Sequence, residues 1–137
     1  MEARAFIPGE YIEETPLRLA IYHRLSRAKS ISEIDDMREE LTDRFGPVPE
    51  AVEALINVIA VKFVASKIEA TGVSIKLGRV TVEFGEVDGL TTERLAAILA
   101  KLPQKTAIRY EKPLSLDIPT EGADELAGAR KVLENLV

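Results

Sequence analysis

The chain has 137 residues, of which 46% are apolar and 30% are charged, a composition typical of one folded domain with a well-solvated surface. It has no cysteine and one histidine, which excludes disulfides, thiolate metal sites, a cysteine nucleophile and a multi-histidine metal cluster. The net charge of −5 is not typical of a domain that binds phosphate backbones over its whole surface, although local basic patches remain open.

Residues 1–14 are expected to form an extended arm that docks through Phe6, Ile7, Tyr11 and Ile12. The first helix is predicted to start at Thr15 as N-cap, with Pro16 at the first helical position. Its apolar residues recur at helical spacing, at Leu17, Ile21, Leu25 and Ala28. The rest of the helix is basic, with Arg18, Arg24, Arg27 and Lys29.

The second helix carries end signals on both sides. Ser30 and Glu33 have the spacing of a capping box, in which each side chain accepts from a free N–H near the helix start. An apolar stripe follows, and Gly46 with Pro47 then predicts the end of the helix. The stripe consists of Ile34, Met37, Leu41 and Phe45.

A third helix, apolar on nearly all sides, is predicted from Pro49 to Thr71, with Gly72 closing it. The segments 73–77 and 80–84 alternate with period two around Gly78-Arg79 and predict a hairpin. A short helix from Thr91 or Thr92 to Lys101, a second strand pair at 106–110 and 114–118, and a last helix over 122–136 complete the order. The fold class is therefore α+β: an N-terminal three-helix segment packed with a small antiparallel sheet of two hairpins, plus two further helices.

The C-terminal elements are expected to join the three helices in one domain over residues 15–137, which we expect to have been cut from a longer protein. No run of about 20 nearly uncharged residues predicts a membrane span, and the N-terminus lacks the pattern of a secretory signal. We therefore expect a cytoplasmic protein without membrane contact, and an isolated domain that is monomeric.

Motifs of catalysis are absent from the sequence. It contains no glycine-rich phosphate loop and no GxSxG elbow, and His23 has no recognisable nucleophile beside it, so a structural role is the simpler interpretation. We expect no enzyme, no catalytic residue, no bound cofactor and no metal. A small enzyme with carboxylate chemistry remains an alternative, which a pocket of converging carboxylates would support.

The second helix has an acidic flank beside its apolar stripe. At about 100° per residue, Asp36, Glu40, Asp43 and Glu33 fall on one side, and Arg44 lies where that side meets the stripe. Glu40 and Arg44 form an i,i+4 pair in the favourable orientation, which leaves Asp43 free to accept from outside. The flank is either a solvated surface or a docking face for basic groups of a partner, ideally arginines.

One family resembles this chain from residue 7 to about residue 72. The segments Ile7-Pro8-x-x-Tyr11-Ile12, Arg18-Leu19-x-x-Tyr22-x-Arg24-Leu25 and Glu40-Leu41-x-Asp43-Arg44-Phe45-Gly46-x-x-Pro49 are similar to the C-terminal domain of the bacterial transcription-repair coupling factors (Mfd). Beyond that range the resemblance extends only to the order of the elements.

The resemblance implies a non-catalytic regulatory domain within an ATP-driven double-stranded DNA translocase. Such a parent engages stalled RNA polymerase, UvrA and double-stranded DNA in transcription-coupled nucleotide excision repair, and its motor modules, with ATP and magnesium, lie outside this chain. The domain would pack on the parent's own UvrA-binding module and keep the translocase repressed. The interaction residues that the resemblance implies are Glu40, Asp43 and Arg44. The helical wheel adds Asp36 and Glu33 as flanking contacts on the same side of the helix.

The basic first helix supports an alternative function. Arg18, Arg24, Arg27 and Lys29 could contact phosphates, which would make the chain a nucleic-acid-contacting module. No aromatic side chains interleave with these basic residues, so a solvated basic face, or a face for an acidic surface, is the simpler interpretation.

Overall fold

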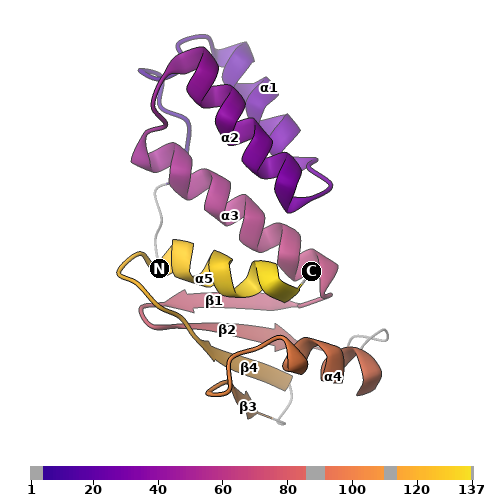
Figure 1. Cartoon of the computed structure of the whole chain (residues 1–137). Coiled ribbons are helices and arrows are strands. Elements are labelled where there is room, and N and C mark those ends of the chain that lie inside the picture. Colours follow the sequence, from indigo (N-terminus) through magenta and orange to yellow (C-terminus); the bar gives the residue numbers. More distant parts are fainter. Residues whose placement is uncertain (1–4, 86–91, 110–113, 137) are drawn as a thin grey trace. The chain divides into compact units, whose positions relative to one another are not determined.

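A computed structural model describes residues 5–85, 92–109 and 114–136 of the chain. It has the element order α1–α2–α3–β1–β2–α4–β3–β4–α5–η1, with five α-helices and one four-stranded antiparallel sheet in these residues (Figure 1). The predicted α+β class is confirmed. The chain divides into two compact units between Phe63 and Val64, inside α3. That residues 15–137 make up one domain stays a prediction.

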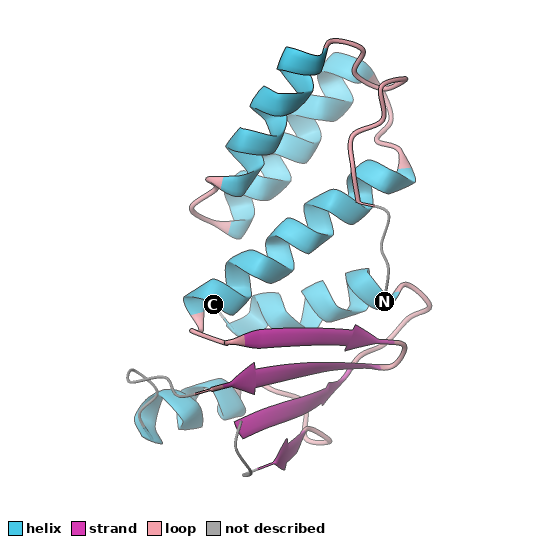
Figure 2. Cartoon of the chain, turned by 180° about the vertical axis from the view of Figure 1, so that it is seen from behind, coloured by secondary structure: helices cyan, strands magenta, loops and turns pink. Residues whose placement is uncertain are grey.

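The N-terminal unit contains α1 (Thr15–Ser26), α2 (Ile31–Phe45) and most of α3 (Glu50–Lys67). Helices α1 and α2 lie side by side, as both views show (Figures 1 and 2). The three helices and the arm enclose one apolar core, and the predicted stripes of α1 and α2 contribute their central residues to it. Its buried members are Ile7, Ile12, Ile21, Leu25, Ile34, Met37, Leu41, Val52, Leu55, Ile56 and Ala60.

The arm folds against this unit instead of running straight. Residues 9–11 form a turn, in which the Tyr11 and Ile12 N–H groups donate to the Pro8 carbonyl oxygen at 3.1 and 3.2 Å. The Ile7 N–H donates to the Tyr22 hydroxyl at 2.7 Å. These bonds hold the arm's backbone, and the buried Ile7 and Ile12 side chains anchor it in the core. The prediction that Phe6 also docks the arm is wrong, because its side chain is exposed.

The structure corrects the predicted start of α1 and the predicted end of α3. Thr15 is the first residue of α1 and not its N-cap; its hydroxyl accepts from Arg18 at 2.9 Å. Glu14 is the N-cap, and its side chain makes no capping bond. Helix α3 ends at Lys67, four residues before the expected end at Thr71, and Glu69 follows with a φ of +61°. Gly72 does not close the helix; it is the first residue of β1.

The C-terminal unit is built on the sheet, with strand order β1-β2-β4-β3 and antiparallel pairing throughout. The strands are β1 (Gly72–Lys76), β2 (Arg79–Phe84), β3 (Ala107–Arg109) and β4 (Leu114–Pro119). Both predicted hairpins are confirmed, but Lys76 pairs with Arg79, so the first turn is Leu77-Gly78 and not Gly78-Arg79. Pairing of β2 with β4 joins the two hairpins into one sheet (Figure 2).

Helices α4 (Thr92–Ala100) and α5 (Glu125–Leu133) complete this unit, and a short 3₁₀ helix, η1 (Glu134–Leu136), follows α5. The predicted last helix starts three residues later than expected, because Asp124 is its N-cap and accepts from the Leu126 and Ala127 N–H groups at 3.1 Å. Helix α5 packs on β1 and β2. The alternative cap Thr91 and the second hairpin's turn at 110–113 lie outside the described residues.

Candidate functional site

The acidic flank, defined as Glu33, Asp36, Glu40 and Asp43, is held on a helix whose start is specified locally. The Ser30 hydroxyl accepts from the Glu33 N–H at 3.0 Å, as predicted. The Glu33 carboxylate accepts from the Lys29 N–H at 3.0 Å, one residue before the N-cap that the capping box predicts. Glu33 therefore serves the helix start as well as the flank.

The other end of α2 is held by the arm. Gly46 ends α2 as predicted, but with φ +90° and ψ −170° and not in the left-handed helical conformation, and its N–H donates to the Thr42 carbonyl oxygen at 3.0 Å. The Tyr11 hydroxyl is shared between the carbonyl oxygens of Leu41 and Gly46, at 3.0 and 2.9 Å. Its ring lies 5.8 Å from the Phe45 ring. The last turn of the flank is therefore fixed by a residue 30 or more positions away in the sequence.

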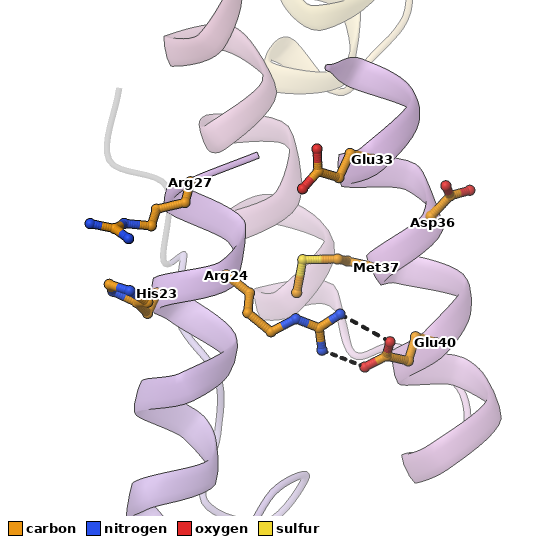
Figure 3. Close-up of a pocket in the computed structure, with 7 residues that line it drawn as sticks. All are labelled: His23, Arg24, Arg27, Glu33, Asp36, Met37 and Glu40. Atoms are coloured by element: carbon orange, nitrogen blue, oxygen red, sulfur yellow. Dashed lines mark hydrogen bonds and ion pairs between the residues drawn. The ribbon is translucent and has the colours of Figure 1, made fainter. Parts of the chain in front are cut away.

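Glu40 is the most heavily bonded member of the flank (Figure 3). Arg24 of α1 donates to both carboxylate oxygens, from Nη1 to Oε2 at 2.7 Å and from Nη2 to Oε1 at 3.1 Å. Arg44 donates to Oε2 at 3.3 Å, which confirms the predicted i,i+4 pair. The hydrogen bond from Arg24, more than any other contact, holds the pKa of Glu40 below its ordinary value, with Arg44 contributing.

Arg44 also links the flank to the apolar stripe of α2. Its guanidinium carbon lies 5.0 Å from the centroid of the Phe45 ring, within the range of a cation–π contact. The Arg44 guanidinium thus lies over an aromatic ring while its Nη1 atom donates to Glu40. The predicted position of Arg44, at the border between flank and stripe, is confirmed.

A groove of about 340 Å³ runs along the surface between α1 and α2. Of the α1 side chains that line it, Arg24 reaches across toward α2 in Figure 3, and Met37 lies between the two helices. Glu33, Asp36 and Glu40 line its α2 side, so three of the four predicted carboxylates share one surface feature. Asp43 is exposed outside the groove, and no ion pair joins it to any residue within the described ranges 5–85, 92–109 and 114–136.

Sequence reasoning missed the contact between Arg24 and Glu40. The sequence placed Arg24 on a solvated basic face. Arg24 and Glu40 are 16 positions apart on different helices, so helical spacing does not relate them. A signal was nevertheless present: Arg24 precedes the buried Leu25 and lies three residues after the buried Ile21, so it borders the face that α1 packs on its neighbour. A cation at such a border reaches the edge of the neighbouring helix.

The basic residues of the nucleic-acid alternative are partly used inside the chain. Arg18 donates to the carbonyl oxygens of Ile12 and Glu13, at 2.6 and 3.0 Å, and so ties down the arm. Arg24 is paired with Glu40. Of the four, only the Arg27 and Lys29 side chains are exposed without such a bond to another described residue. Two cations are few for binding a phosphate backbone.

Three carboxylates and His23 line the groove, so it has side-chain types that the carboxylate-enzyme alternative requires, but Glu40 is not suited to acid catalysis. A general acid near neutral pH needs a carboxyl whose pKa is raised by burial, whereas the pKa of Glu40 is lowered by two arginines and the group is partly exposed. Among the described residues, no group of three or more His, Cys, Asp or Glu side chains is arranged to hold a metal ion. Within the same residues, no helix is long and apolar enough to cross a membrane.

Comparison with known proteins identifies the family. The model described as the TRCF domain matches residues 1–95. The transcription-repair-coupling factor of Myxococcus xanthus is 28% identical over 134 residues, which cover 96% of this chain and 11% of the relative. The factor of Escherichia coli strain K12 is 27% identical over 100 residues, which cover 73% of this chain and 9% of the relative. The chain thus spans about a tenth of the curated relatives that it matches.

The fold has a counterpart among solved structures. A crystal structure described as the C-terminal domain of transcription-repair coupling factor matches with a TM-score of 0.77 and 23% sequence identity, over 99% of this chain and 88% of the other. The similarity therefore includes the whole C-terminal sheet, of which the family model covers β1 and β2 but not β3 and β4. The chain belongs to the transcription-repair coupling factor family and corresponds to its C-terminal domain.

Proposed function

We propose that this chain is a non-catalytic regulatory domain whose acidic flank binds basic groups on the UvrA-binding module of its parent. The parent would be an ATP-driven DNA translocase of transcription-coupled repair that engages RNA polymerase, UvrA and double-stranded DNA. Docking of the flank hides the UvrA-binding surface and keeps the motor repressed. The contact residues are Glu40, Asp43 and Arg44, flanked by Asp36 and Glu33.

One observation carries this proposal: Glu40 already holds a guanidinium in two-point geometry. The carboxylate is accessible from outside, since 36% of its side-chain surface is exposed. Arginine and carboxylate planes match as a fork, so the same oxygens are suited to an arginine of a partner. Asp43 and Asp36, both exposed, extend the acidic surface on either side of Glu40.

The strength of such a contact suits regulation. Exposed ion pairs contribute about 1 kcal/mol or less each, so two or three of them make a weak interface between separate molecules. Within one chain, the tether supplies a high effective concentration and the same contacts suffice to keep the domain docked. Release then needs only a ligand that binds the undocked parent better than the docked one.

The test is to reverse the charge of Glu40 and Asp43 to lysine in the full-length parent. UvrA binding and ATPase activity should both rise, because the partner's basic groups would be repelled and the docked state depopulated. Glu39→Lys is the matched control for the single variant Glu40→Lys: each changes the charge of the same helix by two units, but Glu39 lies about 100° from Glu40 around the axis. Both activities remaining at the repressed level in the double variant would remove the assignment of these residues.

A further inference from the structure

We infer that Arg24 is an internal competitor for the acidic flank: it occupies Glu40 in the undocked domain and is displaced when a basic group of the partner binds. This inference rests on the proposed function, since it concerns the same carboxylate. It assigns to the basic first helix a role in setting how tightly the domain docks.

The geometry leaves no carboxylate oxygen of Glu40 without a donor. Arg24 holds Oε2 at 2.7 Å and Oε1 at 3.1 Å, and Arg44 adds a third bond to Oε2 at 3.3 Å. A partner's guanidinium that approaches in the same fork geometry meets the same lone pairs. It therefore has to replace the two bonds from Arg24 or share the oxygens with them.

The pair is weak enough to be exchanged. The side chains of Arg24 and Glu40 are 49% and 36% exposed, so water screens their attraction. Exposed pairs of this kind shift an equilibrium by about 1.4- to 5-fold. Arg24 can thus lower the occupancy of the docked state within that range without preventing docking.

The pair is not needed to position Glu40. Met37 and Leu41, on either side of it in the sequence, are buried in the core of the N-terminal unit, so packing sets the rotation of α2. The Ser30 cap and the Tyr11 hydroxyl hold the two ends of the helix. Loss of Arg24 should therefore leave the Glu40 backbone in place and free its carboxylate.

The positive charge of Arg24 also opposes docking of a basic partner. The flank has four carboxylates, and Arg24 and Arg44 are the cations bonded to it through Glu40. Replacement of Arg24 by a neutral residue makes the surface more negative by one charge. A basic partner is then attracted more strongly, and the effect should weaken as ionic strength rises.

The experiment uses the full-length parent with Arg24→Gln and measures UvrA affinity at low ionic strength. We expect UvrA binding to weaken by about 1.4- to 5-fold, because a tighter docked state lowers the fraction of the parent that is open to UvrA. Arg27→Gln is the matched control: it loses the same charge from the same groove, and Figure 3 places its guanidinium away from Glu40. Its effect should be smaller.

A double-mutant cycle isolates the competition. In a Glu40→Gln background, Arg24→Gln should change UvrA affinity no more than Arg27→Gln does, since the contested carboxylate is gone. Stronger UvrA binding in the Arg24→Gln single variant would show that Arg24 supports Glu40, and would overturn the inference. So would equal effects of Arg24→Gln and Arg27→Gln.

Failure of the inference and failure of the proposed function give different results. If Glu40→Lys with Asp43→Lys leaves UvrA binding and ATPase activity at the repressed level, the docking assignment is wrong. The inference that Arg24 competes for Glu40 is then wrong as well. If that variant raises both activities while Arg24→Gln does not weaken UvrA binding, only the competition is wrong.

Discussion

Tyr11→Phe tests whether the arm fixes the end of the helix that carries the acidic flank. The substitution removes one hydroxyl, which is shared between the carbonyl oxygens of Leu41 and Gly46 at 3.0 and 2.9 Å. The ring remains, and with it the contact at 5.8 Å to Phe45, so the apolar area buried by residue 11 is almost unchanged. The experiment therefore isolates the hydrogen bonds from the packing.

The expected decrease in the free energy of unfolding follows from the number of hydrogen bonds lost. A single O–H serves two acceptors, so the loss counts as one hydrogen bond of about 0.5–1.5 kcal/mol, with a further contribution from the half-buried Gly46 carbonyl. A total of about 1 kcal/mol lowers the midpoint of thermal unfolding by about 3–4 °C for a chain of this length. Tyr11→Ala should cost more, because it also removes the ring.

Tyr22→Phe is the parallel variant. It removes the hydroxyl that accepts from the Ile7 N–H at 2.7 Å and leaves that N–H without its acceptor beside a buried side chain. Both sites are part-buried, so Tyr22→Phe should lower the free energy of unfolding by about 0.5–1.5 kcal/mol, similar to Tyr11→Phe.

The pH dependence gives a second readout for Tyr11. Burial, and then the charge of Glu53, raise the pKa of Tyr11 above its ordinary value of 10.0. A raised pKa in the folded state means that this stability is fully present below pH 10 and is lost as pH rises toward the folded pKa. The stability difference from Tyr11→Phe should therefore shrink above pH 10 in denaturant titrations. Equal stability of the two proteins near neutral pH would refute the role of the hydroxyl.

Three further variants are checked by denaturant unfolding. Glu40→Gln should lower the free energy of unfolding by less than about 1 kcal/mol at neutral pH. This difference should disappear as pH falls from 4.5 through the lowered pKa of Glu40 in the folded state. A difference that stays constant with pH would contradict the pairing of Glu40 with Arg24. Gly46→Ala should lower the free energy of unfolding by about 1–3 kcal/mol, because a φ of +90° with a ψ of −170° is a conformation essentially restricted to glycine, although nothing lies within 4 Å of the added Cβ. A neutral result would contradict the backbone argument. Gly128→Ala places a Cβ 2.8 Å from the Glu121 carbonyl oxygen. The resulting overpacking should cost about 1–3 kcal/mol, more than the gain of about 1 kcal/mol from the higher helix propensity of alanine. A stabilised variant would show that the carbonyl moves away freely.

Features that depend on neighbouring residues could be predicted from the sequence. The start of α2 at Ser30, its end at Gly46 and the i,i+4 pair between Glu40 and Arg44 involve groups at most four positions apart. Both hairpins followed from period-two alternation and short turns. Errors of a few residues arose where local signals competed, as at Thr15, whose hydroxyl binds Arg18 instead of capping the helix.

Features that depend on packing were decided by the tertiary structure alone. The pairing of β2 with β4 and the hydrogen bond from Tyr11 to the end of α2 both join segments whose separation in sequence carries no periodic signal. Arg24 illustrates the reason. Its charge and its place on a helix were evident, but its partner depended on how α1 and α2 are rotated against their shared core, and burial of the apolar stripes sets that rotation. The sequence by itself determined an acidic flank with defined ends, and packing decided that an arginine of the same domain already occupies it.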